Sequence, residues 1–152
     1  MDILDAERYM MKFDAAKYAV VCPKGTRKFS GLGTRRTPKL YVVGQDRWPI
    51  YVGVTQQRMS DRLRSGFAAK GAGGYHGYAW RHVHTAAWLD VWCLAGEPIS
   101  PTQRDAETVE AEIVFRIRQA GQWPMHQTEI HFHPSNDEHR RIADRVMAHY
   151  AK

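Results

Sequence analysis

The alternation of hydrophobic and polar positions is most informative between residues 40 and 63. Two short runs of β-branched and aromatic residues, at 40–43 and 50–54, flank the turn-forming segment 44–49. Such runs on either side of a turn predict a β-hairpin. The residues that follow have helical spacing, and we expect Thr55 to cap a helix that runs through Leu63.

Residues 87–94 alternate in the way that predicts a third strand. Successive side chains of a strand point to opposite faces, so Trp88 and Trp92 share one face with Asp90. The other face carries Leu89, Val91 and Cys93. A polar residue between two tryptophans predicts that their face is partly hydrated.

Three further helices are predicted from apolar side chains at three- and four-residue steps. The first covers residues 1–20, the second covers 105–120, and the last follows a turn at 134–137 and runs through Tyr150. These elements predict an α/β fold of the α+β type. We expect a small, mainly antiparallel three-stranded sheet flanked by helices, with added helices at both ends.

Length and composition limit the domain organisation and the class of partner. A chain of 152 residues is long enough for one compact domain. We divide it into an N-terminal helix and basic glycine-rich arm (1–38), a core (39–130) and a C-terminal helical extension (131–152). Lys and Arg number 22 against 16 Asp and Glu, a net charge of +6 that favours polyanions as partners.

Cysteine usage and hydropathy bear on the compartment. The two cysteines stand far apart and form no CxxC motif, which favours reduced thiols and a cytoplasmic protein. No apolar run approaches ~18 residues, so no membrane span is expected.

Basic residues are concentrated in the arm, where no acidic residue occurs between Asp14 and Asp46. One interpretation is that the arm lies along a nucleic-acid backbone, and the other is a solvated surface loop. A second group lies in segment 75–84, where aromatic and basic residues occur close together. These side chains can stack on bases, or they can form a wall of the core. The candidate nucleic-acid contacts are Lys24, Arg27, Lys28, Arg35, Arg36, Arg58, Tyr75, His76 and Arg81.

The second predicted helix places a carboxylate near its apolar stripe. At about 100° per residue, Val109, Ile113 and Ile117 face the sheet, and Glu110 lies inside the edge of the same stripe. A buried carboxylate costs several kcal/mol unless a cation or a metal pairs with it. A salt bridge to Arg62 or Arg81 is the structural alternative to a functional role.

Four features in this order resemble the GIY-YIG nuclease family. They are the two tripeptides Lys39-Leu40-Tyr41 and Tyr51-Val52-Gly53, the pair Arg62-Leu63, and Glu110 followed by aliphatic residues. The resemblance covers about residues 39–127, with Lys39 standing where the family has a glycine. It implies a hydrolase that cleaves nucleic acid, DNA in preference to RNA, as a divalent-metal-dependent endonuclease.

The resemblance also implies roles for individual residues. Glu110 would hold Mg²⁺ or Mn²⁺, Arg62 would contact the scissile phosphate, and Tyr41 with Tyr51 would orient or deprotonate the attacking water. Many relatives carry a histidine one turn after the arginine, where this chain has Gly66.

Another departure concerns the asparagine that relatives have after the glutamate helix. His126 and Gln127 are the candidates for its auxiliary role.

Two other functions remain open from the sequence. The first is a non-catalytic nucleic-acid-binding domain that retains the fold. The second is an interaction module stabilised by zinc, because several histidines occur close together in two segments. They are His82, His84, His126, His131 and His133.

Overall fold

The computed structural model describes residues 1–122, 125–127 and 130–151, which form an α+β fold around one antiparallel sheet. In this part of the chain the sheet has six strands in the order β3-β2-β6-β4-β5, with β1 pairing with β6 outside that path. The strands are β1 (Asp2–Ile3), β2 (Glu7–Phe13), β3 (Tyr18–Val21), β4 (Lys39–Gln45), β5 (Trp48–Thr55) and β6 (Ala86–Ala95). The three α-helices in the same residues are α1 (Met59–Ala68), α2 (Gln103–Gln119) and α3 (Asp137–Tyr150).

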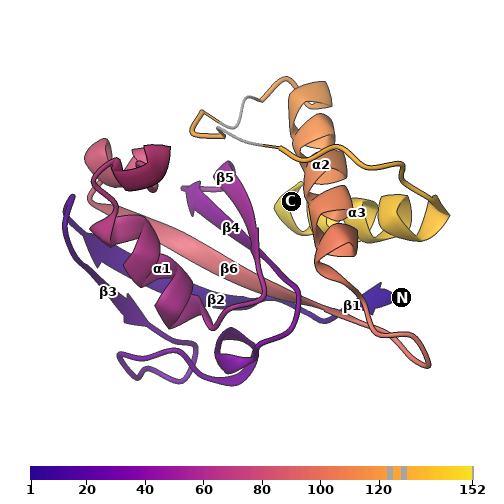
Figure 1. Cartoon of the computed structure of the whole chain (residues 1–152), viewed down its shortest axis with the longest axis horizontal. Coiled ribbons are helices and arrows are strands. Elements are labelled where there is room, and N and C mark those ends of the chain that lie inside the picture. Colours follow the sequence, from indigo (N-terminus) through magenta and orange to yellow (C-terminus); the bar gives the residue numbers. More distant parts are fainter. Residues whose placement is uncertain (123–124, 128–129, 152) are drawn as a thin grey trace.

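The sheet has a hydrophobic cluster on each face, and β6 contributes to both. Figure 1 shows α1 on one side of the sheet and α2 with α3 on the other. Leu89, Val91 and Cys93 belong to the cluster beneath α1, whereas Trp88 and Trp92 pack against α2 and α3. The predicted third strand and the division of its side chains are therefore confirmed. Asp90 is fully buried on the tryptophan face, contrary to the expectation of a partly hydrated face.

The prediction of a helix over residues 1–20 is wrong, because this segment forms β1, β2 and β3. Tyr9, Met11 and Phe13 are buried in alternation with exposed neighbours, which is the period of a strand. Asp14 ends β2 in a turn, where its carboxylate accepts hydrogen bonds from the N–H groups of Ala16 and Lys17 at 2.7 and 2.8 Å. This alternation is only five residues long, whereas apolar residues at three- and four-residue steps extend over the whole segment and favour a helix.

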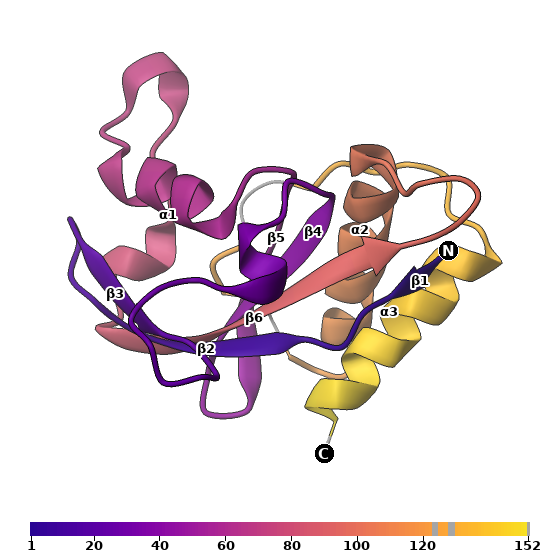
Figure 2. The ribbon, with the colours of Figure 1, turned by 90° about the horizontal axis from the view of Figure 1, so that it is seen from below.

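The sheet is consequently larger than the three strands predicted. β2 pairs with β6 from Glu7↔Val91 to Lys12↔Ala86, so part of the segment predicted to be an N-terminal helix lies inside the sheet. β1 lies beside α3 in both views (Figures 1 and 2). There the terminal amine of Met1 contacts Glu138 at 3.1 Å. The first residues of the chain thus pack against the last helix.

The predicted hairpin is present as β4 and β5, joined by a tight turn in which Asp46 has a φ of 52°. Tyr41 pairs directly with Gly53 across the two strands. The expectation that Thr55 caps α1 is wrong, because the helix begins at Met59 and Thr55 instead accepts a hydrogen bond from the N–H of Gln57 at 3.0 Å. No helix in the described part of the chain is long and apolar enough to cross a membrane.

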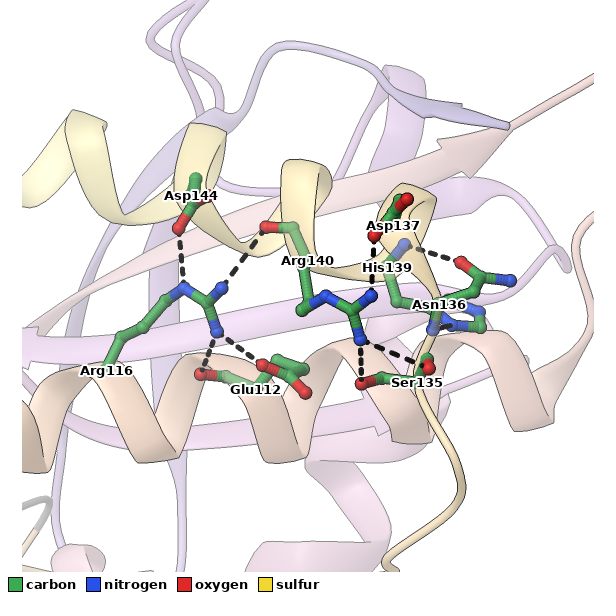
Figure 3. A network of polar contacts seen from close by, with 8 residues as sticks. All are labelled: Glu112, Arg116, Ser135, Asn136, Asp137, His139, Arg140 and Asp144. Atoms are coloured by element: carbon green, nitrogen blue, oxygen red, sulfur yellow. Dashed lines mark hydrogen bonds and ion pairs between the residues drawn. The ribbon is translucent and has the colours of Figure 1, made fainter.

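Arg116 joins α2 to α3 in the network of Figure 3. Arg116 donates to Glu112 on its own helix at 2.5 Å and to Asp144 on α3 at 2.6 Å. Arg140 is held by Ser135 and Asp137. The contacts of Arg116 therefore fix α2, which carries the predicted Glu110, against α3.

Candidate active site

A cavity of about 250 Å³ lies beside β5, which is an edge strand of the sheet. Three of the four residues predicted to be catalytic line it, namely Tyr51 from β5, Arg62 from α1 and Glu110 from α2. Glu110 is only 4% exposed, as its place on the helix predicted, yet it borders the cavity. The chain thus brings together side chains that are 59 positions apart in the sequence.

Tyr41, the fourth predicted residue, lies behind this cavity and is fully buried. Its ring crosses over Gly53, where any side chain would overlap the phenol. Gly53 therefore leaves space for the ring of Tyr41 on the partner strand. The Tyr41 hydroxyl lies 3.0 Å from the hydroxyl of Tyr78, which lines the cavity.

The phenols of this site resist ionisation. Burial raises the pKa of Tyr41 and Tyr51 well above 10, and burial likewise raises the pKa of Tyr78. The charge of Arg62 lowers these pKa values, but by less than burial raises them. All three hydroxyls are consequently protonated at neutral pH and can donate hydrogen bonds.

Arg62 is the cation of the cavity. It donates a hydrogen bond of 2.6 Å to the hydroxyl of Tyr75, a residue with 43% exposure, and its Cζ lies 4.9 Å from the centroid of the Tyr78 ring. Burial lowers the pKa of Arg62, but the surrounding phenols outweigh this and the pKa lies above its ordinary value. The guanidinium therefore keeps its charge in a partly desolvated position.

Helix α2 contributes a row of side chains with carboxylate or amide oxygens to the lining of the cavity. Gln103 and Glu107 line it together with Glu110, at helical spacings of four and three residues. The Oε1 atom of Gln103 is buried and has no hydrogen-bond partner among the described residues, while Glu107 lies 3.4 Å from the imidazole of His133. Carboxylate and amide oxygens are of the ligand type that hard divalent cations prefer.

The two auxiliary candidates occupy different positions. His126 lines the cavity, whereas the side-chain oxygen of Gln127 accepts a hydrogen bond of 3.0 Å from the N–H of Val52 on the edge of β5. Burial, and then the neighbouring His84, lower the pKa of His126, so its imidazole is neutral at neutral pH. The Nε2 atoms of His84 and His126 are buried and unpartnered within the described residues.

The histidines do not assemble into a zinc site in the part of the chain that the structure describes. No three side chains of His, Cys, Asp or Glu in that part come close enough together to hold a metal ion. Structural zinc needs about four protein ligands, whereas magnesium is commonly bound through one or two carboxylates and several waters. The zinc-stabilised module therefore has no support in the described residues.

Most of the predicted nucleic-acid contacts lie on the surface. Exposed side chains include those of Lys24, Arg27, Lys28, Arg35, Arg36, Arg58, Tyr75 and His76. Arg81 is different, because it is buried and donates to the carbonyl oxygens of Gly66, Ala69 and His76. Arg81 therefore holds segment 75–82 against the end of α1, and its predicted contact with nucleic acid does not fit this position.

Sequence reasoning missed three of the polar side chains that line the cavity, those of Tyr78, Gln103 and Glu107. Gln103 and Glu107 could have been found, because they repeat at helical spacing on the side of α2 that carries Glu110. No comparable signal identifies Tyr78, which reaches the cavity only because its segment folds back over α1.

Comparisons with protein-family models, with curated proteins and with solved structures gave no match to this chain.

Proposed function

We propose that this protein is a divalent-metal-dependent endonuclease that cleaves phosphodiester bonds of nucleic acid, with DNA as the preferred substrate. The observation that carries the proposal is the cavity beside β5, which is lined by Tyr51, Arg62 and Glu110. The resemblance of the tyrosine tripeptides, the arginine and the glutamate to the GIY-YIG nucleases supports the same reaction. The preference for DNA rests on that resemblance alone.

Arg62 would bind the scissile phosphate. Cleavage builds negative charge on the phosphoryl oxygens, and a cation that is already in place stabilises that charge without reorganisation. A guanidinium can hold two oxygens at once. In the absence of substrate Arg62 is bonded to the neutral hydroxyl of Tyr75, which an anion can displace at little cost.

Glu110 would hold the divalent cation, with Glu107 and Gln103 available beside it on α2. Such a cation, when bound, stabilises the leaving oxygen and acidifies a coordinated water. The carboxylate row lies on the α2 side of the cavity, and Arg62 comes from α1. A phosphodiester between the two helices would meet opposite charges from its two sides.

The phenols would act as hydrogen-bond donors, because burial keeps them protonated. Tyr51 lines the cavity and can orient an attacking water or a phosphoryl oxygen. His126 is neutral and is the better acceptor for the proton of that water, since a general base must be unprotonated at the working pH. The exposed lysines and arginines of the arm would bind the flanking backbone.

Cleavage of supercoiled plasmid, single-stranded DNA and RNA would test the proposal, with Mg²⁺ or Mn²⁺ and then with chelator. We expect metal-dependent nicking that falls at least about 10²-fold in Arg62→Ala and in Glu110→Gln. The matched controls are Arg64→Ala and Glu112→Gln, which remove the same charges two residues away from each site residue. Arg64 is 74% exposed and contacts Asp61, and Glu112 pairs with Arg116.

Binding without cleavage of any substrate in either metal would contradict the proposal. The protein would then be a nucleic-acid-binding domain that retains the fold. Equal losses in the site variants and their controls would show that charge, rather than the cavity, determines the rate.

A further inference from the structure

Tyr78 lies outside both tripeptides but contacts Tyr41, Tyr51 and Arg62. Its hydroxyl is 3.0 Å from the hydroxyl of Tyr41. Its ring lies beneath Arg62 at 4.9 Å and meets the ring of Tyr51 edge to face, with centroids 5.5 Å apart. One side chain therefore contacts both predicted phenols and the cation.

The position of Tyr78 is fixed by close packing on α1. Its ring occupies the space over Gly66, where any side chain would overlap it. The ring also stacks on Trp80, with centroids 4.8 Å apart and an angle of 23° between the planes. Arg81 donates to the carbonyls of Gly66 and Ala69 and so holds the segment in place. The glycine one turn after Arg62 thus makes room for a tyrosine from another segment.

The hydroxyl of Tyr78 also connects a buried group to the cavity. Tyr41 is fully buried, whereas Tyr78 lines the cavity, and a hydroxyl can donate one hydrogen bond while accepting others. The ring of Tyr78 faces a partly desolvated guanidinium, an arrangement that favours a cation over an aromatic face. The hydroxyl and the ring therefore act on different partners.

We propose that Tyr78 is a positioning residue of the cleavage reaction, in which its hydroxyl orients Tyr41 and its ring orients Arg62. The proposal rests on the endonuclease function proposed above. It assigns this role to a residue from the segment between α1 and β6, outside the four elements that supply the predicted residues. The two parts of the role can be separated by two substitutions.

Tyr78→Phe removes the hydroxyl and keeps the ring. We expect kcat to fall about 10- to 100-fold with KM within about twofold. Tyr41 packs against the ring of Tyr51, with centroids 5.9 Å apart, so a displaced Tyr41 would misorient a side chain of the cavity. Misorientation of such a side chain affects the transition state more than substrate binding. Tyr78→Leu removes the ring as well. We expect it also to weaken duplex binding about fivefold, the equivalent of one cation–π contact on Arg62.

The experiment measures kcat and KM on a labelled duplex with Mg²⁺, and the binding of the same duplex in chelator. Thermal unfolding identifies variants that fail to fold. The matched control is Tyr18→Phe, which removes a hydroxyl bonded to the Ser60 carbonyl at 3.3 Å in the same core cluster. A Tyr41→Phe/Tyr78→Phe double variant should be no slower than the slower single variant, because the two hydroxyls would act as a pair.

A Tyr78→Phe enzyme with the kcat of the Tyr18→Phe control would overturn the role of the hydroxyl, as would additive effects in the double variant. If the wild type binds the duplex but does not cleave it, the endonuclease function fails. Binding then still tests the ring: unchanged affinity in Tyr78→Leu overturns the positioning of Arg62, and fivefold weaker binding supports it. A wild type that neither binds nor cleaves overturns both proposals.

Discussion

Two groups in the described part of the chain each contain an arginine, a buried tyrosine and a carboxylate, namely the group around Asp90 and the cavity with Arg62, Tyr51 and Glu110. Between the sheet and α3, Arg8 donates to Asp90 at 2.7 and 2.9 Å, and Tyr150 donates to the same carboxylate at 2.9 Å. Beside β5, Arg62 donates to the neutral hydroxyl of Tyr75. The residue types are similar, but the partner of the guanidinium differs.

This difference separates a structural contact from a candidate site. The carboxylate of Asp90 is fully buried and is used by two donors from β2 and α3, so the group fastens the last helix to the sheet. The hydroxyl of Tyr75 is neutral and exposed, and a phosphate can replace it as the acceptor for Arg62. Composition alone does not distinguish the two groups, whereas the charge and exposure of the acceptor do.

The largest effect on stability is expected at Asp90. Asp90→Asn should lower the free energy of unfolding by about 2–3 kcal/mol, less than for a wholly buried pair because the Arg8 side chain is 45% exposed. Chemical denaturation measures this value. Glu110→Gln serves as the counterpart on α2 and should change stability less than Asp90→Asn while abolishing cleavage. A reversed order of the two stability losses would remove the distinction between the groups.

The buried phenols should make the free energy of unfolding fall at alkaline pH. Burial raises the pKa of Tyr78 in the folded protein above its value in the unfolded chain. The contribution of this phenol to stability is therefore complete below about pH 10. It is lost as the pH rises further, because the phenol then ionises more readily in the unfolded chain than in the folded protein. At pH 11 the loss should be about 1 kcal/mol for each such phenol.

Tyr78→Phe tests this contribution in denaturation curves between pH 8 and 11. Its free energy of unfolding should fall by about 1 kcal/mol less than that of the wild type over this interval. Identical pH dependence of the two proteins would mean that the phenol is accessible to water in the folded state.

The smallest effect is expected at Tyr75. Tyr75→Phe removes the hydroxyl that accepts from Arg62, and the exposed contact should contribute no more than about 0.5 kcal/mol to stability. Duplex affinity in chelator should stay within about threefold of the wild type, because phosphate would displace this hydroxyl in any case. A tenfold loss of affinity would instead identify Tyr75 as a direct ligand of the nucleic acid.

Local patterns predicted most of the elements that build the site. The hairpin, α1, β6, α2 and α3 were all recognised from period and turn residues. The inward position of Glu110 followed from helix geometry alone, because its angle on α2 is fixed by the apolar residues around it. The first twenty residues were misread, since the alternation of Tyr9, Met11 and Phe13 is short and its burial depends on pairing with β6, eighty positions away.

The sequence by itself determined which side chains are available and which way each one faces on its own helix or strand, because these depend on neighbours only a few residues apart. It did not determine which of them meet. The docking of Tyr78 over Gly66, the withdrawal of Arg81 into the core and the gathering of Gln103 and Glu107 beside Tyr51 arise from contacts between distant segments. Such contacts depend on the packing of whole elements against the sheet, and only the tertiary structure specifies that packing.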